Sequence, residues 1–138
     1  SDGAHGLKVE TGNWTPTIKG STTAGANTYY TQVGKYIRIG KLVTVYFNIY
    51  LNTADANMAG NLLIGELPFV PYEDAYNAMG QINNVTLSTG YTELTINAEY
   101  NKGNLKVILS GTGTPAIATV SVVKAGTALR GQISYIIA

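Results

Sequence analysis

Apolar and polar residues alternate strictly through the middle of the chain. From Val43 to Leu51 the odd positions are all apolar, and the positions between them are Thr, Tyr, Asn and Tyr. A period of two predicts a β-strand with one buried face and one wetter face. A second alternating run, from Leu94 to Tyr100, is followed by Asn101-Lys102-Gly103-Asn104 and by the apolar residues 105–109. Residues able to take positive φ between two such runs predict a hairpin.

Further strands are expected between the glycines, prolines and asparagines that divide the chain, at residues 28–39, 61–67, 79–87, 116–123 and 129–137. No segment has a helical pattern, because residues 54–59 could form one turn at most before Gly60 ends it. Short strands with close turns predict an all-β chain, an antiparallel β-sandwich of the jelly-roll type. With 138 residues, we expect a flexible lead-in over residues 1–11 and a single domain over 12–138.

The last strand departs from simple alternation, because Ile133, Tyr135, Ile136 and Ile137 place apolar groups on both faces. Either this strand is central and buried on both sides, or one side meets another subunit. Charged residues make up only 12% of the chain, which favours the second alternative, since an exposed apolar patch usually marks an interface. We therefore predict that these four residues form an oligomer interface.

Composition excludes several classes of function. The net charge is +1 and no basic run is present, which argues against nucleic acid as a partner. The one small basic cluster, Lys35, Arg38 and Lys41, suits protection of an edge strand, with contact to an anionic glycan as the alternative. There is no cysteine and one histidine, His5, so we expect no metal site and no cofactor. No apolar run reaches the roughly 18 residues that a membrane span needs, and we expect no membrane insertion.

The carboxylates do not suggest catalysis. Glu93 and Glu99 share one face of a predicted strand, but six residues of extended chain hold them roughly 20 Å apart, too far for a glycosidase pair. Glu73 and Asp74 are neighbours in a predicted loop, where solvation or hydrogen bonding to a ligand suits them better. His5 stands among glycines, where nothing would hold a catalytic base rigidly. We predict that the chain is not an enzyme.

Tyrosine is the most suggestive feature of the composition, with 10 Tyr against 2 Phe. Its flat apolar face and polar tip suit both subunit interfaces and stacking on sugar rings. The loop after Pro71 combines two tyrosines, two carboxylates and an amide, and the asparagine turn of the hairpin offers a second rim. The predicted ligand-binding residues are Tyr72, Glu73, Asp74, Tyr76, Asn77, Asn101 and Asn104.

Several short motifs follow one another in the first half of the chain, and together they carry a resemblance to a known family. They are Gly12-Asn13-Trp14-Thr15-Pro16-Thr17, residues 20–25, Tyr29, Gln32, Gly34, Tyr36, residues 39–40 and 42–43, Met58-Ala59-Gly60-Asn61 and Leu67-Pro68-Phe69-Val70-Pro71. Over about residues 6–71 the chain resembles the C-terminal domain of bacteriophage tail fibres, tailspikes and pre-neck appendage proteins. The second half resembles it only in being rich in strands.

This resemblance implies a domain at the distal end of a homotrimeric fibre in the phage tail. Its partners would be the rest of the tail fibre and a polysaccharide of the host cell surface, and Trp14 would belong to the framework. We therefore expect a non-catalytic receptor-binding tip. The alternatives are a cap for trimerisation or folding that binds no receptor, and an enzyme acting on envelope glycan, which the missing base and the distant carboxylates disfavour.

Overall fold

The computed structural model describes the backbone of residues 8–138, and their side chains outside residues 75–82. It is all-β, as the alternating patterns predict, and the single helix in the described part is one 3-10 turn. In chain order the elements are β1 (Val9–Trp14), β2 (Thr17–Gly20), β3 (Thr28–Ile39), β4 (Leu42–Thr53), β5 (Leu62–Gly65), β6 (Ala75–Asn83), β7 (Tyr91–Ala98), β8 (Leu105–Gly111), β9 (Ala116–Ile117), η1 (Val120–Val122) and β10 (Ala128–Ile136).

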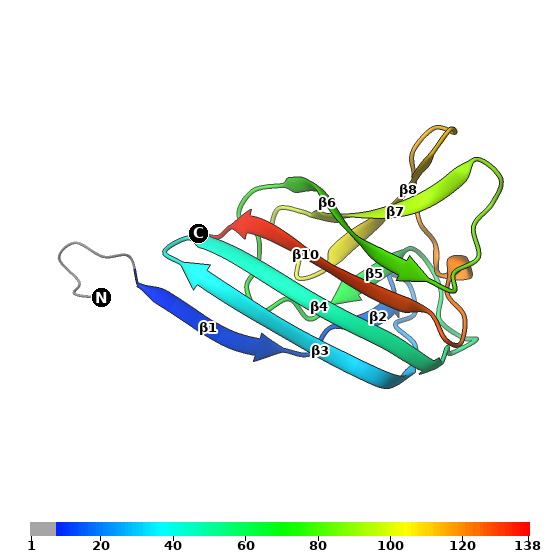
Figure 1. Cartoon of the computed structure of the whole chain (residues 1–138), viewed down its shortest axis with the longest axis horizontal. Helices are drawn as coiled ribbons and strands as arrows, with labels where there is room; N and C mark the ends of the chain where they lie inside the picture. The colour runs from blue at the N-terminus through cyan, green and yellow to red at the C-terminus, as the bar shows by residue number, and fades with distance from the viewer. Residues whose placement is uncertain (1–7) are drawn as a thin grey trace.

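The strands form two layers joined along one side (Figure 1). Strands β1, β3, β4 and β10 make the front layer, and β7, β8, β5 and β2 make the back layer. Strand β6 belongs to both, because its first half pairs with β7 and its residues 80–83 pair with β10. Neighbouring strands run antiparallel throughout the described sheets. The predicted antiparallel β-sandwich is confirmed.

The core lies between the layers and takes alternate residues from each long strand. In β4 the predicted dry face is buried, and Val43, Val45 and Leu51 are fully inaccessible. The back layer contributes apolar residues from β7 and β8, which are Leu94, Ile96, Ala98, Leu105, Val107 and Leu109. On the front-layer strands, the residues between the buried ones point away from the core. They form the outer face of this layer.

The final strand differs from the sequence-based expectation. Strand β10 is central in the front layer, between β4 and β6. Ile133, Tyr135 and Ile137 are 3%, 2% and 7% exposed, so they belong to the core of one chain and are not free to form a subunit interface. The prediction is therefore wrong for these three residues. Their large apolar side chains fill the space between the layers, and only Ile136, which is 36% exposed, points outward.

Strand β1 begins inside the segment expected to be a flexible lead-in. Residues 9–11 pair with β3 in continuous register, starting at Val9 opposite Ile39. Residues 1–7 lie outside the described part. The strand carries little hydrophobic signal because it is an edge strand with an outer face, and a glycine occupies one of its inner positions. A Cβ at Gly12 would stand 2.5 Å from the Tyr36 ring, so the glycine makes room for that side chain.

Trp14 closes the edge where the chain passes from the front layer to the back layer. Its indole is 8% exposed, and its Nε1–H points between two strands, 3.1 Å from the carbonyl oxygens of both Lys35 and Tyr46. A Cβ at Gly34 would lie 2.7 Å from the indole, so this position must remain small. The role in the framework that the resemblance implies for Trp14 agrees with this placement.

The apolar run at residues 116–123 forms a shorter strand than expected. Only β9 pairs with β8, and the chain then turns into η1. The backbone bonds of the following residues go to the start of β5, since Leu62 donates to the Ala118 carbonyl and Val120 donates to the Gly60 carbonyl. The long hairpin of β7 and β8, in contrast, forms as predicted.

Candidate functional site

A loop of residues 66–74 joins β5 to β6, and hydrogen bonds fix it to the front layer. The Tyr135 hydroxyl donates to the Phe69 carbonyl at 2.7 Å, and the Tyr72 N–H donates to the Ile136 carbonyl at 2.7 Å. Burial raises the pKa of the Tyr135 hydroxyl, so this donor keeps its proton to a higher pH than an exposed tyrosine would. The loop is thus held at both its middle and its exposed end.

The turn of the β7–β8 hairpin lies directly beside this loop. The Asn101 N–H donates to the Pro71 carbonyl at 2.9 Å, and the Leu67 N–H donates to the Gly103 carbonyl at 3.1 Å. Asn101 takes a φ of 58°, a conformation that asparagine tolerates better than most residues. The loop after Pro71 and the asparagine turn, which was predicted as its second rim, therefore share one surface.

Two tyrosines stand together on that surface. The rings of Tyr72 and Tyr100 meet edge to face, with centroids 5.8 Å apart and planes at 77°, and the residues are 52% and 57% exposed. The Asp74 carboxylate accepts the Tyr100 N–H at 2.7 Å. We call the group of Tyr72, Glu73, Asp74, Tyr100 and Asn101 the Tyr72 site.

Some of the predicted residues fall elsewhere. Asn104 is half-buried. Tyr76 and Asn77 belong to β6 rather than to a loop, and their side chains lie outside the described residues. Tyr100 was expected on the apolar face of a strand and not in the site. Strand β7 ends at Ala98, and Tyr100 turns outward. Its position next to an asparagine turn was the available signal.

The Tyr72 site offers two kinds of contact. Exposed aromatic edges and faces suit the apolar side of a sugar ring, and the Glu73 carboxylate and Asn101 amide are exposed hydrogen-bonding groups. The Glu99 carboxylate is paired with the Lys106 ammonium at 3.4 Å. No group of three potential metal ligands occurs among the described residues, and no helix in the same part is long and apolar enough to cross a membrane.

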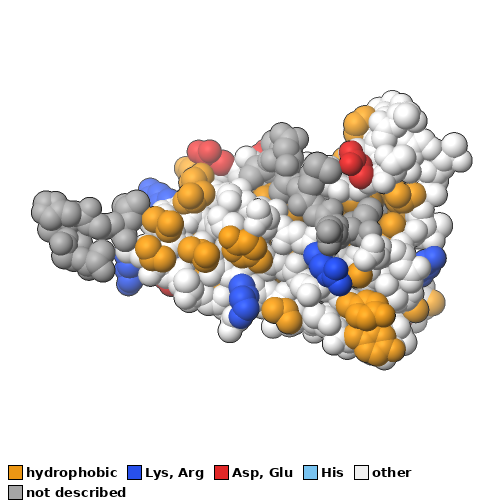
Figure 2. Space-filling model, in the orientation of Figure 1, with side chains coloured by type: hydrophobic (Ala, Val, Ile, Leu, Met, Phe, Trp, Pro, Cys, Tyr) orange, Lys and Arg blue, Asp and Glu red, His pale blue; other side chains and the backbone are white. Residues whose placement is uncertain are grey.

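An exposed apolar row borders the site. Val9, Ile39, Leu42 and Ile136 stand side by side on the outer face, in register across β1, β3, β4 and β10. They are 61%, 36%, 43% and 36% exposed, and Figure 2 shows apolar side chains gathered at this end of the outer face. Because Tyr72 is hydrogen-bonded to the backbone of Ile136, the apolar row and the Tyr72 site are contiguous.

Comparison with known proteins gives a structural match. No family model and no curated protein sequence matches the chain. Among solved structures, the chain is similar to part of the Dettilon tailspike protein, with a TM-score of 0.73 and 17% sequence identity. The alignment covers 93% of this chain and 23% of the tailspike chain, so the similarity spans less than a quarter of that protein. The fold of this chain is thus one that also occurs within a phage tailspike.

Proposed function

We propose that this chain is a receptor-binding domain of a phage tail fibre or tailspike, and that it holds a host-surface polysaccharide without cleaving it. The observation that carries the proposal is the Tyr72 site, where two loops distant in sequence present a pair of exposed tyrosines beside polar side chains. The tailspike-like fold supports the location in a phage tail, and so do the motifs that resemble tail-fibre domains.

Binding at the Tyr72 site would use stacking together with hydrogen bonds. A sugar ring would lie against Tyr72 or Tyr100, and its hydroxyls would donate to Glu73 and accept from Asn101. Each site of this kind binds weakly, because it is open to solvent. Three copies in a homotrimer would raise the overall affinity by 10² or more through effective concentration.

The hydrogen bonds of the acidic groups support binding rather than catalysis. An Asp74 carboxylate oxygen is occupied by the Tyr100 N–H, and Glu99 is occupied by Lys106. The Asp74 bond therefore joins the two segments of the site, and the Glu99–Lys106 pair lies within the β7–β8 hairpin. A general acid and a base or nucleophile would instead need to face one another across the scissile bond.

The test is an array of bacterial lipopolysaccharides and capsular polysaccharides probed with the full chain. Tyr72→Ala and Tyr100→Ala should each weaken binding to the best polysaccharide about fivefold, since stacking contributes on the order of 1 kcal/mol. The matched control is Tyr30→Ala, because Tyr30 is also exposed, at 65%, and also contacts a second tyrosine, Tyr50, at 5.0 Å.

Unchanged binding by both Tyr72→Ala and Tyr100→Ala, with normal folding, would move the receptor site elsewhere. If Tyr30→Ala weakens polysaccharide binding equally, the loss of binding comes from removing any exposed tyrosine and is not specific to the Tyr72 site. Release of reducing sugar from the bound polysaccharide would identify an enzyme and overturn the non-catalytic part of the proposal.

A second candidate function, a trimerisation cap, is favoured by the apolar row. Four neighbouring apolar residues exposed on one sheet suit a contact between copies of the chain. A chain that assembles into trimers yet binds no polysaccharide on the array would favour this candidate.

A further inference from the structure

The outer face of the front layer has an unusual charge pattern. Strands β1, β3, β4 and β10 each direct alternate residues to it, and these are Val9, Thr11, Asn13, Val33, Lys35, Ile37, Ile39, Leu42, Thr44, Tyr46, Asn48, Tyr50, Arg130, Gln132, Ser134 and Ile136. Lys35 and Arg130 are cations, and none of these described residues is acidic. Figure 2 likewise shows blue side chains but no red one in the middle of this face.

A hollow lies in this face between β1, β3 and β4. It has a volume of about 510 Å³, and Thr11, Asn13, Lys35, Ile37 and Tyr46 line it. The register explains how they meet, because Asn13, Lys35 and Tyr46 are direct cross-strand neighbours. Tyr46 is 38% exposed, so its ring forms one wall of the hollow.

Both cations are oriented by amide side chains. The Lys35 ammonium donates to Asn13 Oδ1 at 3.1 Å, and the Arg130 Nε–H donates to Asn48 Oδ1 at 3.1 Å. Neither has a carboxylate partner among the described ion pairs. Each bond uses one donor. Two N–H groups of the Lys35 ammonium and the two terminal NH2 groups of the Arg130 guanidinium are left for a ligand.

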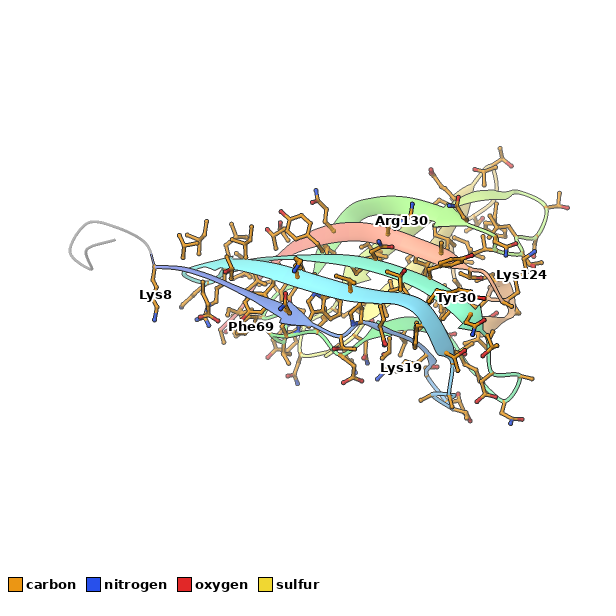
Figure 3. All side chains as sticks on the ribbon, turned by 60° about the horizontal axis from the view of Figure 1, so that its bottom comes forward. Lys8, Lys19, Tyr30, Phe69, Lys124 and Arg130 are labelled. Carbon is orange, nitrogen blue, oxygen red and sulfur yellow. The ribbon has the colours of Figure 1, made fainter. Side chains whose placement is uncertain are left out.

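The spacing of the two cations indicates an extended ligand. Lys35 is on β3 and Arg130 on β10, with β4 between them, which separates their backbones by about 10 Å across the sheet and about 7 Å along the strands. Tyr46, Asn48 and Gln132 lie between. Figure 3 shows Arg130 projecting from this layer. Because the Lys35 ammonium bonds to Asn13 on β1, on the side of β3 away from β10, an oligosaccharide suits the two cations better than a single small anion.

We propose that this hollow and the strip from Lys35 to Arg130 form a second glycan site, specific for acidic sugars whose carboxylates meet the two cations while one ring stacks on Tyr46. It goes beyond the proposed function, because none of its residues belongs to the Tyr72 site. Unpaired cations on a face without acids select an anionic ligand. The hydroxyl and amide side chains around them suit sugar hydroxyls.

A second copy of the chain fits this part of the face less well. Lysine is depleted at the centres of protein interfaces, and the strip is mainly polar, unlike the apolar row two to three cross-strand rows away. The apolar row can therefore meet a neighbouring subunit while the strip stays open.

The test is titration of the full chain with tri-galacturonate and with trisialic acid, followed by amide NMR shifts, with maltotriose as the neutral comparison. At least one acidic trisaccharide should shift the amides of Lys35, Tyr46 and Arg130, and maltotriose should bind at least tenfold more weakly. Lys35→Gln and Arg130→Gln should each weaken binding about tenfold, the usual size of a charge-assisted hydrogen bond. The binding should also weaken as salt is raised.

A control variant separates this site from its alternatives. Lys124→Gln removes an exposed positive charge at another part of the surface and should leave binding unchanged. The proposal is overturned if neither acidic trisaccharide binds, if maltotriose binds equally well, or if Lys124→Gln weakens binding as much as Lys35→Gln. It is also overturned if Arg130→Glu dissociates an oligomer in light scattering, since a second copy would then cover the strip.

Discussion

Trp14 is a side chain of the core that also bonds to two strands of the front layer. Its ring fills the edge of the core, and its Nε1–H is the donor for two carbonyl groups of neighbouring strands. Gly34 must stay small for the ring to fit. The resemblance to tail-fibre domains implies a framework role for Trp14, but the shared hydrogen bond depends on the register of β3 and β4.

Trp14→Phe tests this role. Phenylalanine keeps most of the apolar surface but leaves two partly buried carbonyl groups without their donor, so the free energy of unfolding should fall by about 1–3 kcal/mol. Urea unfolding followed by circular dichroism measures it. Phe47→Leu, a core change without hydrogen-bond loss, is the comparison and should cost about 1 kcal/mol. Equal stability of Trp14→Phe and the parent would mean that the indole N–H contributes nothing.

Strands could be predicted from the sequence where their two faces differ in polarity. They were harder to predict where the two faces are alike. The alternation of β4 and the hairpin of β7 and β8 are local patterns, so they are visible in the sequence. Strand β1 has a solvated outer face and a glycine inside, which hides its pattern. The apolar run that ends in η1 follows the start of β5 instead of continuing along β8, and this choice depends on distant backbone partners. The contact between Tyr72 and Tyr100 likewise depends on backbone hydrogen bonds between segments that are distant in the sequence.

A loop at the opposite end of the sandwich depends on one carboxylate. Residues 53–56, Met58, residues 120–121 and residues 123–125 line a hollow of about 590 Å³ there. The Asp55 carboxylate accepts the N–H groups of Asn57 at 2.9 Å and Ala26 at 2.8 Å. These bonds, that from Asn57 first, lower the pKa of Asp55 because they favour the charged form.

Acid should therefore loosen this loop before the rest of the molecule. A carboxyl group with a lowered folded pKa stabilises the folded form fully above its usual value, about pH 4, and loses this contribution as pH falls through the folded pKa. Hydrogen exchange at the amides of Ala26 and Asn57 should accelerate below pH 4 relative to core amides. Asp55→Asn should show fast exchange already at pH 7, and Glu93→Gln should behave like the parent. Slow exchange in Asp55→Asn would contradict this.

In the molecule as a whole, the Tyr72 site and the apolar row occupy the same end. The Tyr72 N–H bond to Ile136 joins them, so an oligomer formed through the apolar row would bring the sites of neighbouring copies close together. Only Ile136 remains of the four residues that the sequence suggested for an interface. A change at Ile136 must therefore be tested for assembly and for binding at the same time.

Ile136→Lys should break up the expected trimer, because a buried unpaired charge costs several kcal/mol. Light scattering on the parent should give three times the chain mass of 14.6 kDa, and the variant should give that of one chain. Val33→Lys is the control, since Val33 is 46% exposed on the same face but outside the apolar row. A parent that stays monomeric at micromolar concentration, or a variant that remains trimeric, would contradict assembly through this row.

The place of β10 in the front layer has a consequence for how the chain folds during synthesis. Its Ser134 hydroxyl lies 2.7 Å from that of Thr44, 90 residues away in the sequence. Until β10 leaves the ribosome, β4 has an unpaired edge and β6 lacks one of its two partners. Such contacts close slowly, and open strand edges invite pairing between chains. The nascent chain is therefore most prone to aggregate during the time between the synthesis of β4 and that of β10.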